Sequence, residues 1–153
     1  MERIIKIKLR TKAISSSLFF ISFFLLQACR VSLVPTYDAA LQTQIENAAK
    51  MTDKLYLEMM NAPAAEKNYA LYSKSYLDIE VEINSILMKN EIRSNAGDIV
   101  ASVKALKTYF EQAKKDHADR QTLSNAEFLI YNEQLKALWK PVLLEEIALS
   151  KVK

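Results

Sequence analysis

The chain has 153 residues, of which 25% are charged, and its formal net charge is +3. It contains one glycine and three prolines, too few for the many tight turns that an all-β fold needs. Its single cysteine excludes a disulfide within one chain, and one cysteine with one histidine cannot supply the ligands of a zinc site.

The N-terminal segment has the layout of a secretory signal peptide. Five Lys and Arg residues lie between residues 3 and 12, and a mostly apolar run follows over residues 13–26. This run is short for a membrane-spanning helix, which needs roughly 20 residues. A small residue, Ala28, then directly precedes Cys29.

The end of this segment carries a family resemblance. Leu26-Gln27-Ala28-Cys29 resembles the lipobox of bacterial lipoproteins, where a leucine and a small residue precede an obligatory cysteine. The resemblance implies a signal peptide over residues 1–28, cleaved before Cys29, and diacylglyceryl and acyl (palmitate-type) chains on that cysteine. The alternative is an uncleaved N-terminal anchor with an incidental cysteine.

The residue after the cysteine bears on sorting between membranes. In enterobacterial lipoproteins an aspartate at that position tends to retain the protein in the inner membrane, whereas this chain has Arg30. The resemblance therefore implies an outer-membrane protein that faces the periplasm.

Removal of the leader changes the charge balance. The first 28 residues hold five of the 21 basic residues and one of the 18 acidic residues, which leaves 16 basic and 17 acidic residues and a net charge of −1. The remaining chain therefore lacks the basic footprint of a nucleic-acid-binding protein. We expect membrane lipid, reached through acylated Cys29, among its partners, and no nucleic acid.

Residues 29–36 are predicted to form a lipidated tether, and residues 37–153 a helical bundle domain. Apolar residues recur at spacings of three and four throughout this domain, as expected of helices with one buried face. The four stripes start at Leu41, Tyr69, Ile99 and Phe128 and reach Met59, Ile86, His117 and Val142, and the last also includes Trp139 and Leu144. They predict helices near residues 37–60, 64–92, 96–119 and 125–151.

These helices predict an all-α fold. Short connections between long helices make sequence neighbours antiparallel, so we expect an up-down bundle of four helices. The alternative is three long helices, with the second and third merged into one bent rod.

Local signals mark the expected breaks between helices. Pro63 suits a first helical turn, because its missing N–H is harmless there. Residues 94–98 are expected to cap the third helix, and Ser124 with Glu127 forms a capping box for the fourth. Pro141 is expected to kink or break the fourth helix, because it removes a backbone hydrogen bond.

The residues with catalytic or metal-binding potential do not form a convincing constellation. His117 continues a core stripe, which favours a partly buried histidine at a bundle end over a haem ligand. The pairs Glu80 with Glu82 and Glu145 with Glu146 point in different directions on a helix, so we expect solvated surface carboxylates. We therefore predict neither a cofactor nor an enzyme.

Tyrosines are the most distinctive feature of the domain. Tyr69, Tyr72 and Tyr76 share one stripe, and rings of this kind can line a ligand groove or fill a core. Three further tyrosines could face that stripe, namely Tyr56, Tyr109 and Tyr131. The core role is favoured, as it is for Trp139 beside Pro141. If a ligand or partner does bind, Tyr69, Tyr72, Tyr76 and Trp139 are its candidate contacts.

The domain also resembles short helical envelope lipoproteins of unassigned function. That resemblance rests on Tyr37-Asp38, on Ile92-Arg93 after the tyrosine-bearing helix, and on residues 143–151. It implies a membrane-anchored, non-enzymatic interaction or structural module that binds another envelope protein or itself. The alternative is a carrier of small apolar or aromatic ligands, with a tyrosine-lined groove between helices.

Overall fold

The computed structural model describes residues 33–152, so the leader and Cys29 lie outside the described part. Val34–Lys153 forms one compact unit. Its helices are α2 (Ala39–Asn61), the short 3-10 helix η1 (Ala64–Glu66), α3 (Tyr69–Glu91), α4 (Gly97–Arg120) and α5 (Asn125–Leu149). Over the described residues the fold is all-α, as predicted, with no strand.

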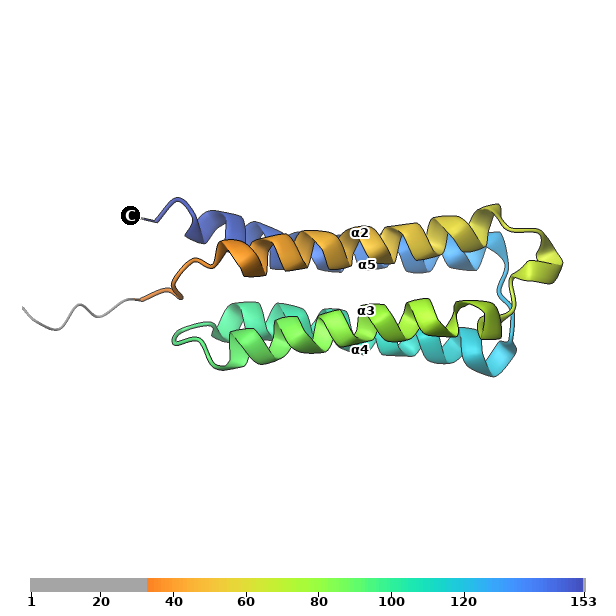
Figure 1. The fold of residues 1–153 in the computed structure, drawn as a ribbon, viewed down its shortest axis with the longest axis horizontal. Helices are drawn as coiled ribbons and strands as arrows, with labels where there is room; N and C mark the ends of the chain where they lie inside the picture. Colours follow the sequence, from red (N-terminus) through yellow and green to blue (C-terminus); the bar gives the residue numbers. More distant parts are fainter. Residues whose placement is uncertain (1–32, 153) are drawn as a thin grey trace, which may run out of the picture. The chain divides into compact units, whose positions relative to one another are not determined.

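The four long helices pack as an antiparallel up-down bundle (Figure 1). Each packs against two others: α2 contacts α3 and α5, and α4 contacts α3 and α5. The three-helix alternative is wrong, because α3 ends at Glu91 and α4 begins at Gly97. Asn95, in the connection, has a φ of 62°, a left-handed conformation that reverses the chain and that asparagine tolerates better than most residues.

The predicted apolar stripes form the core. Every stripe residue of α2 and of α4 is buried, and the two stripes meet those of α3 and α5 in one cluster. Tyr69 and Tyr72 at the start of α3 are partly buried instead. The prediction for Leu144 is wrong, since its side chain is 52% exposed on the outer side of α5.

Local sequence signals predict the cap of α5 correctly, but not the caps of α3 and α4. Ser124 and Glu127 form the predicted capping box at the start of α5. Pro63 does not open α3; it precedes η1, and α3 begins later, behind the N-cap Asn68. The N-cap of α4 is Ala96, which makes no side-chain cap bond.

Pro141 does not break α5, which runs continuously from Asn125 to Leu149. The proline is exposed to solvent. Water can therefore hydrate the Ala137 carbonyl, to which a proline offers no N–H. Among the described residues, none of the helices combines the length and hydropathy of a membrane span.

Different segments of the chain form the two ends of the bundle. At the entry end, which we define as residues 34–38, 92–96 and 146–152, the chain enters α2, turns from α3 to α4, and leaves α5 (Figure 1). We define the far end as residues 62–68 and 121–124. There η1 meets the α4–α5 connection, and the Tyr69 N–H donates to the Gln121 carbonyl at 2.9 Å.

Candidate functional site

The lipidation motif cannot be located in the structure. Leu26, Gln27, Ala28 and Cys29 all lie outside the described residues. The candidate contacts that the structure does describe are the α3 tyrosines and Trp139.

The α3 tyrosines form part of the core near the far end. Tyr76 is fully buried, and its ring lies 5.7 Å from that of Tyr69 and 6.4 Å, edge-on, from that of Tyr56. Tyr72 is partly buried, and its ring lies 6.5 Å from the His117 imidazole. These rings fill space between helices, as the core interpretation predicted.

His117 lies at the centre of this aromatic cluster and is more buried than predicted, with no exposed surface. Its Nε2 lies 2.8 Å from the Lys67 carbonyl oxygen, and its Nδ1 lies 3.1 Å from the Tyr76 hydroxyl. A carbonyl only accepts, so Nε2 carries the proton, and the neutral ring accepts from Tyr76 at Nδ1. Burial lowers the pKa of His117 below its ordinary value, although the bond to Lys67 opposes this shift.

Tyr109 and Tyr131 form a second aromatic pair, between α4 and α5. Their ring centres are 6.0 Å apart, and the Tyr131 hydroxyl donates to Asp116 Oδ2 at 2.5 Å. Burial, helped by this contact with a carboxylate, raises the pKa of Tyr131 to about 12. Of the three further tyrosines, only Tyr56 makes a ring contact with the α3 stripe, through Tyr76. Tyr109 and Tyr131 contact each other instead.

Trp139 acts in packing between α5 and α2. Its side chain is buried, and its indole N–H donates to Thr52 Oγ at 3.2 Å. The Thr52 hydroxyl in turn donates to the Ala48 carbonyl at 2.8 Å. This buried chain of hydrogen bonds satisfies the indole N–H, as a buried tryptophan requires.

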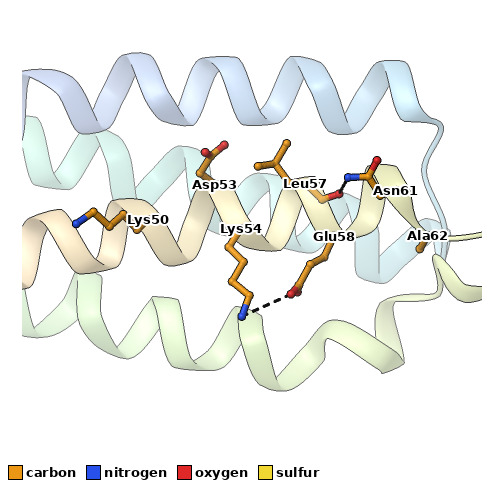
Figure 2. A pocket seen from close by; sticks show the side chains of 7 residues that line it. All are labelled: Lys50, Asp53, Lys54, Leu57, Glu58, Asn61 and Ala62. Carbon is orange, nitrogen blue, oxygen red and sulfur yellow. Dashed lines mark hydrogen bonds and ion pairs between the residues drawn. The ribbon is translucent and has the colours of Figure 1, made fainter.

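The surface hollows are open to solvent, and four of them bear on the tyrosine prediction. One of about 510 Å³ is lined by seven residues between Lys50 and Ala62, all from α2 and its C-cap. Figure 2 shows that two of them, Lys54 and Glu58, form an ion pair along α2. A second, of about 320 Å³, borders Trp139 between α2 and α5. A third, of about 660 Å³ between α4 and α5, is lined by Tyr109, and a small one of about 130 Å³ lies between α2 and α3. Tyr69, Tyr72 and Tyr76 line none of these four hollows, so the α3 tyrosines do not form a groove there.

The expectation that Glu145 and Glu146 are solvated is wrong. Glu146 has no exposed surface, and its carboxylate accepts from the two terminal guanidinium nitrogens of Arg93, Nη1 at 2.7 Å and Nη2 at 3.2 Å. Glu145 is partly buried, and its Oε1 accepts from Ser102 Oγ at 3.1 Å. Burial raises the pKa of the Glu145 carboxyl above its ordinary value, against the effect of that hydrogen bond.

Arg93 and Glu146 hold the entering chain at the entry end. The Asp38 N–H donates to Glu146 Oε1 at 2.9 Å, and Arg93 Nη2 donates to the Thr36 carbonyl. Arg93 Nη1 also donates to Asn90 Oδ1 at 2.8 Å, and Asn90 is buried. Three separate chain segments are therefore joined through one buried ion pair.

The carboxylates of Glu80 and Glu82 also bond to other helices, and are not simply solvated on the surface. Glu80 accepts from Lys114 Nζ at 2.6 Å, and Glu82 accepts from Gln44 Nε2 at 2.7 Å. Each therefore links α3 to a different neighbouring helix, and the two carboxylates do not converge on one reacting group. Within residues 33–152, no three acidic, histidine or cysteine side chains are grouped to hold a metal ion.

Comparisons with protein-family models, with curated proteins and with solved structures find no match for this chain.

Proposed function

We propose that this chain is a lipoprotein, anchored to the membrane through acylated Cys29, that acts as a non-enzymatic interaction module of the cell envelope. The anchor is supported by the order of basic residues, apolar run, Ala28 and Cys29 in the leader. The residue Arg30 favours the outer membrane and a bundle that faces the periplasm.

The outer face of α3 is the observation that supports an interaction role. Leu77, Val81 and Met88 are 54, 55 and 61% exposed, and their spacings of four and seven place them on one line along the helix. Leu71, nearer the start of α3, is 65% exposed. In contrast, α4 exposes no large hydrophobic side chain between Gly97 and Arg120.

An aligned row of this kind differs from scattered exposed apolar residues, which are ordinary on protein surfaces. A partner helix could bury the whole row at once, whether it belongs to another envelope protein or to a second copy of this chain. The ligand-carrier alternative has less support, because Tyr69 and Tyr76 pack against each other and His117 within the core.

The anchor is tested by replacing Cys29 with serine. We expect the variant to lose both lipidation and cleavage, and so to run as a precursor about 28 residues longer, because processing requires the modified cysteine. It should incorporate no labelled fatty acid, whereas the wild-type chain should. Processing of the serine variant to wild-type size would show that the lipobox interpretation is wrong.

The interaction surface is tested by photocrosslinking in cells. A photoreactive amino acid is placed at Val81 on α3 or, as the matched control, at exposed Thr108 on α4. We expect a discrete adduct from Val81 only, and an adduct of twice the monomer mass would identify self-association. Equal adducts at both positions, or none at either, would argue against a binding role for this face.

A further inference from the structure

The chain that enters the bundle is fixed to it before α2 begins. Pro35 is buried, the Thr36 carbonyl accepts from Arg93, and the Asp38 N–H donates to Glu146 Oε1 at 2.9 Å. The compact unit accordingly starts at Val34. The segment that can act as a tether is therefore shorter than the predicted residues 29–36.

The short tether limits how far the entry end can lie from the lipid. Five residue steps separate Cys29 from Val34, and in any conformation they span at most about 18 Å. The helices of 23 to 25 residues are roughly 35 Å long at 1.5 Å per residue. An anchored bundle must therefore keep its entry end near the membrane, while its far end can point away.

The entry end carries the exposed apolar side chains that such a position would need. Ile92, just after α3, is 82% exposed, and Val152, after α5, is 61% exposed. Tyr37 is 38% exposed and suits the interface, where tyrosine places its ring among the headgroups. At the far end, residues 62–68 and 121–124 expose no large hydrophobic side chain.

The charges at the entry end are compatible with a lipid surface. Within the entry end, Glu146 is buried with Arg93, exposed Asp38 accepts from the Ala40 and Leu41 N–H groups, and Lys151 is an exposed cation. Next to it, Glu91 pairs with Lys104 at 3.0 Å. Asp98 remains exposed in the first turn of α4, where the helix N-terminus favours a negative charge.

We propose that the entry end, through Ile92, Val152 and Tyr37, docks on the membrane interface and holds the bundle end-on to the lipid. This inference rests on the proposed anchor at Cys29. It adds a second, weak contact to the acyl chains, and it leaves the row of α3 free to meet a partner. A bundle lying on its side would instead bury that row in the headgroups.

The test measures the depth of single thiol probes in the lipidated full-length protein. Cys29 is the only cysteine, and lipidation converts its sulfur to a thioether, so one introduced cysteine is the only thiol. The variants are Ile92→Cys and Val152→Cys at the entry end, Thr122→Cys at the far end, and Val81→Cys on α3. Each carries an environment-sensitive fluorophore in phosphatidylethanolamine and phosphatidylglycerol vesicles that contain nitroxide lipids.

We expect several-fold stronger nitroxide quenching, and blue-shifted emission, at residues 92 and 152 than at residues 81 and 122. Adding Ile92→Asp to the Val152→Cys protein should weaken the quenching at residue 152, and because residue 92 is exposed the fold should be retained. Equal quenching at residues 92 and 122, or no effect of Ile92→Asp, would overturn the docking. Strong quenching at residue 81 would overturn it in favour of a side-on bundle.

The same preparation separates this inference from the anchor on which it rests. Wild-type protein should be inert to a thiol reagent after denaturation, because Cys29 is acylated. A reactive wild-type thiol would refute the anchor and the docking together. An inert thiol with equal probe depths at both ends would refute the docking alone.

Discussion

Arg93 and Glu146, which are 53 residues apart in the sequence, form a two-pronged ion pair at the entry end of the bundle. The Glu146 side chain is fully buried, and 14% of the Arg93 side chain is exposed. A buried carboxylate is tolerated only when it is paired and hydrogen-bonded. Arg93 and the Asp38 N–H provide those partners, so this pair fixes three segments of the chain at once.

Replacing Arg93 with alanine should lower the free energy of unfolding by about 3 kcal/mol, because it leaves the Glu146 charge buried without a cation. Arg93→Lys should cost less, since an ammonium keeps the charge but cannot bond both carboxylate oxygens as a fork. The measurement is urea unfolding of residues 34–153, followed by helical circular dichroism.

The control is Lys74→Ala, which removes an exposed ion pair to Asp78 of 2.7 Å and should cost less than about 0.5 kcal/mol. If Arg93→Ala and Lys74→Ala lower the free energy of unfolding by similar amounts, the burial of Glu146 does not increase the cost of losing its cation.

His117 should make the bundle less stable in mild acid. In the unfolded chain its pKa is close to the ordinary value of 6.5, and burial lowers the pKa in the fold. Below pH 6.5 the unfolded chain therefore binds a proton that the folded chain does not. The contribution of neutral His117 to stability is complete above that pH. As the pH falls below 6.5, this contribution should decrease by up to about 1.4 kcal/mol per pH unit, until the folded-state pKa is reached.

The matched variant is His117→Gln, which cannot titrate. It should be less stable at neutral pH, because the contacts with Tyr76 and Lys67 are changed, but its stability should vary less between about pH 5.5 and 7.5. Denaturant midpoints across this range give the slopes directly. A wild-type slope no steeper than that of the variant would contradict the role assigned to His117.

Glu145 should affect the pH dependence of stability in the opposite direction to His117. Its Oε2 is buried and has no hydrogen-bond partner among the described residues, and burial raises the pKa of this carboxyl. Its charge therefore costs stability above the folded-state pKa, and protonation removes the cost as the pH falls. Glu145→Gln should stabilise the bundle by about 1 kcal/mol at neutral pH and by less in acid.

The measurement for Glu145→Gln is the urea midpoint at pH 7 and near pH 4. The control is Glu133→Gln, since Glu133 is an exposed partner of Lys136 on the same helix and should change stability little. An equal effect of the two variants at neutral pH would show that the environment of Glu145 is not special.

The helices and their buried faces could be predicted because both depend on local spacing. The stripe from Leu41 to Met59 and the capping box at Ser124 each involve residues within a few turns of one another. The predicted start of the second helix, residue 64, is too early because Pro63 is a stronger local signal than Asn68. The structure shows that Asn68 caps the helix, by accepting from the Ala70 N–H at 2.9 Å.

The entry-end contacts were missed because they join distant segments. One signal was present: Glu146 follows Val142 by four residues and Trp139 by seven, so it falls on the buried stripe of α5. Its partner Arg93 stands beyond the end of α3, where helical spacing gives no information. The Lys67 carbonyl that accepts from His117 is likewise a loop backbone group that no side-chain pattern marks.

The last prediction concerns the residues just before α2. A fragment of residues 34–153 should fold cooperatively, as expected of a small single domain, because it contains the whole core. A fragment of residues 39–153 loses the Thr36 carbonyl and Asp38. The Asp38 side chain is the N-cap that accepts from the Ala40 and Leu41 N–H groups, and its backbone N–H donates to Glu146.

Removal of these contacts should lower the free energy of unfolding by about 2–3 kcal/mol, roughly half from the lost cap and half from the buried Glu146 that loses a donor. A fragment of residues 37–153 keeps Asp38 and should lie between the other two. Urea midpoints of the three fragments, compared at one pH, measure the difference. If all three midpoints coincide, residues 34–38 are not held by Arg93 and Glu146. The tether from Cys29 would then reach to α2 itself, and the entry end would be free to move away from the membrane.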